Sequence, residues 1–288
     1  MHDLSRPRPD PCPGGGAAPH YDRPVSEPGA GEGPRRWTLQ TVLERDRLFV
    51  GAGLVGVSGL AWIYSVSGVG PMSGEMHVPR TAVWAPFDAW LVFVMWAVMM
   101  VAMMVPSASP VVIAFATLQR RQNTSARVWT TVGAFLSGYL LVWTAFSGLA
   151  TLAQWGLQRA ALLTPTGASA TSWLAGVFMV TAGAFQWTEL KTSCLRHCRS
   201  PFAFFLASWR DGVGGAIRMG IEHGVVCVGC CWALMLLMFV AGVMNVYWLA
   251  GLALFVLVEK VAPGGERFGR WAGLGLIGWG VMLLSEAV

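Results

Sequence analysis

The segment EHGVVCVGCCWALMLLM, residues 222–238, places thiol, imidazole and thioether groups in an otherwise apolar run. In a helix that turns about 100° per residue, one stripe carries four of these side chains: His223, Cys227, Cys231 and Met238. Cys230 flanks the stripe, and Glu222 faces elsewhere, where we expect a basic partner. Thiolate, imidazole and thioether groups together form the ligand set of a soft metal ion.

Two other interpretations of this stripe stay open. Cysteines placed close together also carry thiol redox chemistry, and buried free cysteines often pack as small hydrophobic residues. Ionisable groups inside an apolar span are costly and are functional by default, so the stripe favours metal binding over packing.

A second sulfur-rich segment is WLVFVMWAVMMVAMMVPSASP, residues 90–110. Met95, Met99 and Met103 repeat every four residues and therefore share a helix face, while Met100 and Met104 form a second pair on a neighbouring face. Methionine is a common packing residue in apolar helices. Its thioether is also a ligand that selects Cu(I), and the thiol stripe strengthens this second interpretation.

A third cluster lies in FQWTELKTSCLRHCRSPFAFF, residues 185–205, which we expect to be a cytoplasmic loop. Cys194 and Cys198 are one helical turn apart, and His197 precedes the second cysteine. The basic residues around them are expected to lower the thiol pKa and favour the thiolate. This spacing is not that of a zinc ribbon, so it indicates soft-metal or redox use. Lys191 is expected to pair with Glu189 or to anchor the end of a span.

The elements that must position these residues are strongly apolar. The chain of 288 residues is 55% hydrophobic and 12% charged, with a mean hydropathy of +0.54. This composition predicts an all-α, polytopic membrane bundle. We expect seven spans, at about residues 48–66, 88–105, 128–152, 173–187, 221–243, 246–258 and 271–284, the second continuing as helix past its two prolines.

In a membrane protein, the distribution of lysines and arginines indicates how the chain is oriented in the bilayer. With the N-terminus in the cytoplasm, all of the 20 lysines and arginines except Arg80 and Arg159 fall on the cytoplasmic side. The net charge of +5 is therefore no sign of nucleic-acid binding, and no basic stripe with interleaved aromatic residues is present.

Residues 1–36 are rich in proline, glycine and charge and predict a disordered cytoplasmic tail ahead of a transmembrane domain at 37–288. Cys12 and His20 in the tail are interpreted as incidental. Met72, Met76 and His77, in the segment after the first span, are interpreted as loop residues rather than as a metal site.

No motif of a known catalyst is present. The chain has no phosphate-binding G-x-x-x-x-G-K-[ST] loop and no G-x-S-x-G nucleophile elbow. We therefore expect a protein that is not an enzyme and that does not use ATP itself.

Three segments together resemble a known family: MWAVMMVAMMVPSASP, FQWTELKTSCLRHCRSP and GIEHGVVCVGCCWALMLLMFVAGVMN. The chain is similar, over roughly residues 85–285, to bacterial proteins described as predicted metal-binding integral membrane proteins, some of which are labelled copper chaperones. The resemblance implies a multi-pass protein of the bacterial inner membrane. It points to ten residues as the functional set: Met99, Met100, Met103, Met104, Cys194, Cys198, His223, Cys227, Cys230 and Cys231.

The predicted function is Cu(I) binding between the second and fifth spans, for copper handling, delivery or transport. The cluster around Cys198 would be a separate cytoplasmic station of the route. Expected partners are the lipid bilayer, the metal ion and copper-delivery or oxidase-assembly proteins. Two alternatives stay open: a membrane thiol–disulfide electron carrier, and a non-catalytic assembly or partner protein whose sulfur-containing residues only pack.

Overall fold

A computed structural model describes residues 51–65, 84–120, 125–164, 166–243 and 245–287 of the chain. Within these residues the regular structure is helical, apart from an isolated β-bridge between Leu163 and Ser169. The all-α prediction is therefore confirmed for the described part of the chain. The predicted tail at 1–36 and the segment that holds Met72, Met76 and His77 lie outside the described residues.

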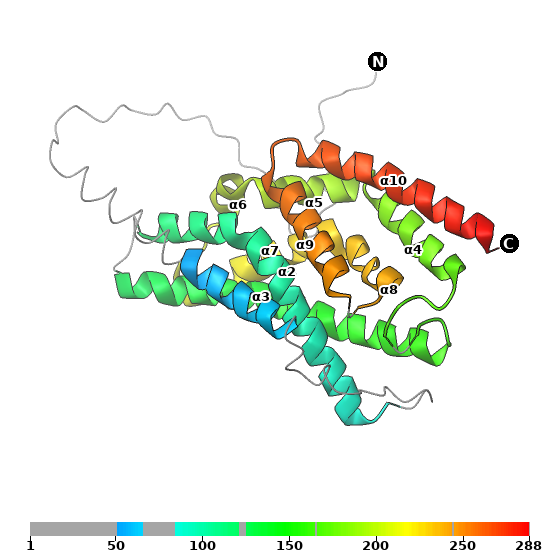
Figure 1. The fold of residues 1–288 in the computed structure, drawn as a ribbon. Helices are drawn as coiled ribbons and strands as arrows, with labels where there is room; N and C mark the ends of the chain where they lie inside the picture. Colours follow the sequence, from blue (N-terminus) through cyan, green and yellow to red (C-terminus); the bar gives the residue numbers. More distant parts are fainter. Residues whose placement is uncertain (1–50, 66–83, 121–124, 165, 244, 288) are drawn as a thin grey trace, which may run out of the picture.

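Figure 1 shows the arrangement of the described helices. They are Gly51–Ser65, α2 (Pro86–Arg120), α3 (Ser125–Arg159), α4 (Ser172–Phe185), α5 (Glu189–Arg199), α6 (Pro201–Ser208), α7 (Gly212–Met235), α8 (Met238–Ala241), α9 (Val246–Val261) and α10 (Gly265–Glu286).

Three helical segments are long and apolar enough to cross a membrane: α2, residues 127–159 of α3, and residues 212–241 of α7 and α8. The seven predicted spans are not supported. The predicted fourth and sixth spans form α4 and α9, whose 14 and 16 residues fall short of the roughly 20 that a bilayer requires. The predicted seventh span forms α10, a glycine-rich helix that begins with charged residues.

Close packing of α3 against α7 depends on two glycines. A Cβ atom at Gly220 would collide with the carbonyl oxygen of Phe135, and one at Gly138 would collide with that of Ile217. Small residues allow two helices to approach until their backbones touch. The helix α7 begins at Gly212, before the predicted start near residue 221, so Gly220 lies inside the helix at this crossing.

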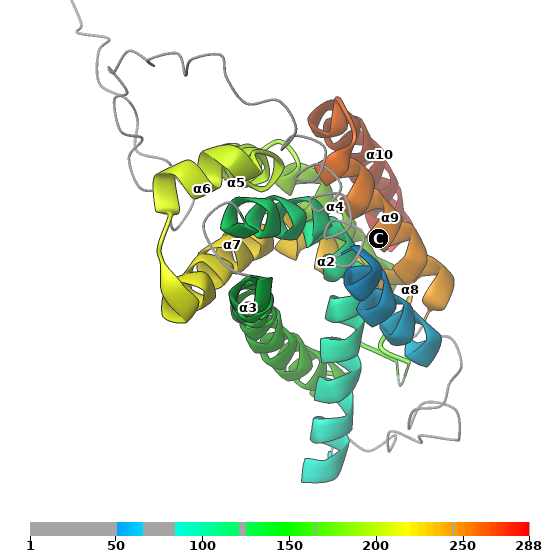
Figure 2. The same ribbon diagram turned by 90° about the vertical axis from the view of Figure 1, so that its left-hand side faces the viewer.

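The two prolines inside α2 leave two carbonyl groups without their usual helical partner, as a proline has no N–H to donate to the residue four positions earlier. Pro106 frees the carbonyl of Ala102, which accepts hydrogen bonds from Ser58 Oγ and Trp62 Nε1, both at 3.2 Å. The carbonyl of Pro106 accepts from Ser109 Oγ at 2.7 Å. The helix Gly51–Ser65 thus lies beside α2 (Figure 2).

At the other end of the molecule α4 and α10 lie side by side (Figure 1). Their contact again uses glycines, since a Cβ at Gly176 would lie 2.8 Å from the Gly280 carbonyl oxygen and one at Gly183 would lie 2.6 Å from that of Gly273. The segment of the chain between α4 and α7 was predicted as a loop, but it forms the helices α5 and α6. The hydroxyl of Thr188 caps α5 by accepting a hydrogen bond from the Lys191 backbone N–H at 3.2 Å.

Candidate metal-binding site

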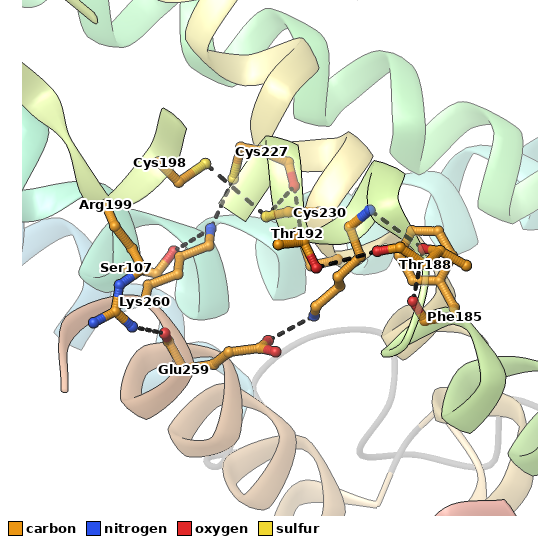
Figure 3. A network of polar contacts seen from close by, with 12 residues as sticks. Ser107, Phe185, Thr188, Thr192, Cys198, Arg199, Cys227, Cys230, Glu259 and Lys260 are labelled. Carbon is orange, nitrogen blue, oxygen red and sulfur yellow. Dashed lines mark hydrogen bonds and ion pairs between the residues drawn. The ribbon is translucent and has the colours of Figure 1, made fainter. Parts of the chain in front are cut away.

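Four buried free thiols in the described part of the chain come from two helices, α5 and α7. Figure 3 shows three of them, Cys198, Cys227 and Cys230. Cys198 Sγ of α5 lies 4.0 Å from Cys230 Sγ of α7. Within α7, the thiols of Cys230 and Cys231 donate to the carbonyl oxygen of Cys227 at 3.1 and 2.9 Å. Cys198 was expected to belong to a separate cytoplasmic station, and the structure corrects this by placing it in the same thiol cluster as α7. We call Cys198, Cys227, Cys230 and Cys231 the thiol cluster.

The separation of Cys198 and Cys230 is compatible with a shared ion. With metal–sulfur bonds of roughly 2.3 Å, sulfurs 4.0 Å apart subtend about 120° at the ion. Among the described residues, however, no three His, Cys, Asp or Glu side chains are already arranged as a metal site. A site with three protein ligands would therefore need a side chain to move toward this pair.

Lys260 of α9 brings a positive charge into contact with the thiol cluster. Its ammonium group donates to Cys227 Sγ at 2.9 Å and to Ser107 Oγ at 3.2 Å, and its side chain is buried (Figure 3). Burial acts to lower the pKa of Lys260, but the negative charge of the thiols, that of Cys227 first, outweighs it and raises the pKa well above its usual value. Sequence reasoning missed this residue by counting it as a loop charge.

Tyr139 of α3 is a second residue that sequence reasoning missed. Its buried hydroxyl lies 3.2 Å from Cys227 Sγ and donates to the backbone carbonyl of Met104, also at 3.2 Å. The carbonyl of Met104 also accepts from Ser107 Oγ at 2.9 Å. Hydrogen bonds through Tyr139 and Ser107 therefore connect α2 to the thiol cluster. A tyrosine inside an apolar run could have signalled this role, since a buried hydroxyl requires a partner.

The two histidines of the predicted site have different surroundings. His223 is buried one turn before Cys227, and its imidazole packs against the rings of Tyr139, Phe135 and Phe204, with centroids 5.7, 6.2 and 5.6 Å away. His197 is half-buried, and its Nδ1 lies 3.0 Å from the carbonyl oxygen of Ser193 on the same helix. The cysteines of the thiol cluster thus contact one another across two helices, whereas the imidazole of His223 packs against aromatic rings and that of His197 lies beside a backbone carbonyl.

All six predicted methionine ligands are buried, and they share one hydrophobic core with the thiol cluster. They are Met95, Met99, Met100, Met103, Met104 and Met238. The helix of the stripe ends at Met235, so Met238 begins α8 and does not continue the face predicted from a single helix. Glu222 pairs with Arg218 at 3.2 Å and with Arg210 at 3.5 Å, away from the thiols.

A buried ion pair attaches α5, which carries Cys198, to α9, which carries Lys260. Lys191 Nζ lies 2.7 Å from Glu259 Oε2, with both side chains buried. Arg199 donates to the backbone carbonyls of Glu259 and Ala262 at 2.6 and 2.7 Å, at the C-terminal end of α9. The predicted pairing of Lys191 with Glu189 was therefore wrong, because the fold brings Glu259 to Lys191.

The contacts of α5 also explain the state of its cysteines. Hydrogen bonds to Cys227 and Cys230, together with burial, raise the pKa of the Cys198 thiol, contrary to the expected lowering. The basic residues nearby act elsewhere, since Arg199 binds carbonyl groups and Lys191 binds Glu259. Cys194 is buried against α7, where a Cβ at Gly229 would lie 3.0 Å from its Sγ.

A family model described as "Copper chaperone" (PpoB2) matches residues 93–283. No curated protein and no solved structure matches the chain. The matched range contains the thiol cluster, Lys260, Tyr139 and all six buried methionines of the predicted site.

Proposed function

The chain belongs to the PpoB2 copper chaperone family, and we propose that it carries Cu(I) as cargo between two members of the thiol cluster, Cys198 and Cys230. The observation that carries this proposal is the 4.0 Å separation of Cys198 Sγ and Cys230 Sγ, which lie on different helices. Thiolates are the ligands that soft monovalent copper prefers. A pair of thiols from two helices can hold an ion between them and release it when the helices separate.

The methionines of α2 are proposed as the weaker sites on the route of the ion. Thioethers bind Cu(I) without carrying charge, and those of Met99, Met100, Met103 and Met104 are packed in the same core as the thiols. Exchange of the ion between neutral thioethers and stronger thiolates permits its passage without an energy source in this chain. The role is that of a carrier, not of an enzyme.

The proposed location is a bacterial inner membrane, with the N-terminus in the cytoplasm. Three helical segments can span a bilayer by length and composition, and α3 exposes large apolar side chains such as Leu141, Leu149 and Leu152. Such residues suit contact with lipid acyl chains. Copper-delivery or oxidase-assembly proteins are the proposed recipients of the ion.

The test is Cu(I) binding by protein purified without oxygen, in competition with a chromophoric Cu(I) chelator. We expect C198S/C230S to lose the tight site that the wild type has. Cys231→Ser is the matched control, because a serine hydroxyl can still donate to the Cys227 carbonyl and the Cys231 thiol has its described hydrogen bond within α7. Equal affinity in the wild type and the double variant would refute the proposal.

The 4.0 Å separation also favours one alternative, a thiol pair that cycles between dithiol and disulfide. A disulfide would need the two sulfur atoms to approach to about 2.05 Å, with two electrons and two protons passing to an oxidised partner. Mass spectrometry of the alkylated protein distinguishes the two functions. A reversible Cys198–Cys230 crosslink in protein that never binds Cu(I) would favour the electron carrier.

A further inference from the structure

The positive charge of Lys260 has no carboxylate partner among the described residues. The neighbouring acid, Glu259, belongs to the ion pair with Lys191, and none of the ion pairs in the described part of the chain includes Lys260. The ammonium group instead contacts a hydroxyl, that of Ser107, and a sulfur, that of Cys227. A buried charge is costly unless an opposite charge balances it. Among the described residues that Lys260 contacts directly, the thiol of Cys227 is the group that can supply the balancing negative charge.

The net charge of the thiol cluster with a metal ion bound depends on the charge of that ion. Two thiolates that bind a monovalent ion form a complex with one net negative charge, whereas two thiolates that bind a divalent ion form a neutral complex. An ammonium beside the sulfurs balances the first complex and leaves an excess positive charge beside the second. Because the site is buried, this difference is screened far less than it would be in water.

We propose that Lys260 is a specificity-determining residue whose fixed positive charge makes the thiol cluster favour a monovalent soft ion over a divalent one. The inference rests on the proposed binding of Cu(I) by this cluster. Lys260 remains an ammonium throughout and need not ligate the ion. Ser107 holds the ammonium in place, since its hydroxyl accepts from Lys260 and donates to the Met104 carbonyl of α2.

The hydrogen bonds around α9 explain why the charge is held firmly. Arg199 binds the carbonyls of Glu259 and Ala262 on either side of Lys260, and the Lys191–Glu259 pair fixes the preceding residue. Glu259 and Lys260 are adjacent in the helix and reach different neighbours, Glu259 toward α5 and Lys260 toward α2 and α7 (Figure 3). The C-terminal end of α9 therefore places two charges in different surroundings. Glu259 lies against α5, where Lys191 neutralises it, and Lys260 lies against the thiols.

The test compares Cu(I) and Hg(II), two soft ions that differ in charge, on the full-length wild type and on Lys260→Gln and Lys260→Arg. Lys260→Gln removes the charge and adds no thioether, a group that could itself bind Cu(I). We expect it to weaken Cu(I) binding by about 10- to 100-fold, the usual effect of losing a group that supports a metal site, while Hg(II) affinity stays the same or rises. Lys260→Arg keeps the charge and should keep the wild-type ratio of the two affinities. Lys260→Leu serves as the neutral variant if Lys260→Gln does not fold.

The pattern of outcomes separates this inference from the proposed function. If Lys260 had only a structural role, its neutral variant would bind both ions more weakly. If its role were incidental, the affinity for neither ion would change. Either result overturns the inference. A wild-type protein that binds Hg(II) through Cys198 and Cys230 but has no tight Cu(I) site would instead refute the proposed copper function. Selective loss of Cu(I) affinity in the neutral variant alone supports both.

Discussion

Lys191 and Glu259 form a buried ion pair of 2.7 Å that joins α5 to α9. The pair sets the position of both elements that reach the thiols of α7, since α5 carries Cys198 and α9 carries Lys260. Together with the hydrogen bonds that Arg199 donates to α9, this ion pair holds a thiol and an ammonium against the same helix.

Removing one partner of the Lys191–Glu259 pair should destabilise the protein strongly. Lys191→Met leaves the Glu259 carboxylate buried without its partner, which costs about 3–5 kcal/mol of unfolding free energy. The double variant Lys191→Met with Glu259→Met should recover much of that loss, because two apolar side chains replace two charges. Unfolding in detergent micelles measures both. Losses that simply add in the double variant would show that the pair is not coupled.

Enlarging Gly220 should separate α3 from α7. In Gly220→Val the new side chain meets the Phe135 carbonyl, and overpacking of this kind costs about 1–3 kcal/mol. Gly133→Ala is the matched control on α3, since no atom lies within 4 Å of the added Cβ, and it should stabilise the helix by up to about 1 kcal/mol. The same unfolding measurement compares the two, and a stable Gly220→Val variant would contradict the close crossing.

Removing the hydroxyl of Tyr139 should weaken the connection between α2 and the thiol cluster. Tyr139→Phe keeps the ring that packs against His223 and loses the hydrogen bond to the Met104 carbonyl, a net cost of about 1 kcal/mol. Cu(I) affinity should fall as well, because Cys227 loses a neighbour that fixes its sulfur. Unchanged stability together with unchanged Cu(I) affinity would show that the hydroxyl has no role at this site.

Replacing thioethers by alkyl groups should separate metal binding from packing in α2. Met103→Leu with Met104→Leu conserves volume and should change the unfolding free energy by less than about 1.5 kcal/mol. If the methionines carry Cu(I), the variant should load copper more slowly from a chelator than the wild type does. Met282→Leu is the control, as Met282 is half-exposed on α10 and lies outside the sulfur-rich core. Equal loading rates in all three proteins would leave the methionines a packing role only.

Local patterns in the sequence predicted the sulfur-bearing helices well. The four-residue spacing of Met95, Met99 and Met103 indicated one long helix, and α2 does continue through both of its prolines. The thiols at Cys227 and Cys231 were expected to lie within a helix, and they do. Periodicity is a property of neighbouring residues, so it can be read without knowing the fold.

Contacts between distant segments could not be predicted in this way. Cys198 and Cys230 meet because α5 folds back onto α7, and no spacing in the chain encodes that approach. Lys260 was counted as a loop charge because it follows an apolar run directly, and only the fold shows that its ammonium turns inward. Span counting failed for the same reason, since apolar residues that pack in a protein core resemble those that face lipid.

Because Pro106 has no N–H, it leaves a carbonyl group of α2 available for the helix Gly51–Ser65 to bind. The hydrogen bonds that Ser58 and Trp62 of the first described helix donate to α2 end on the Ala102 carbonyl, which is available because the nitrogen of Pro106 carries no proton. An ordinary residue at position 106 would offer its own N–H to that carbonyl and compete with both donors. The attachment of one helix therefore depends on the N–H that Pro106 lacks, so substitutions at position 106 are best assessed by the behaviour of residues 51–65.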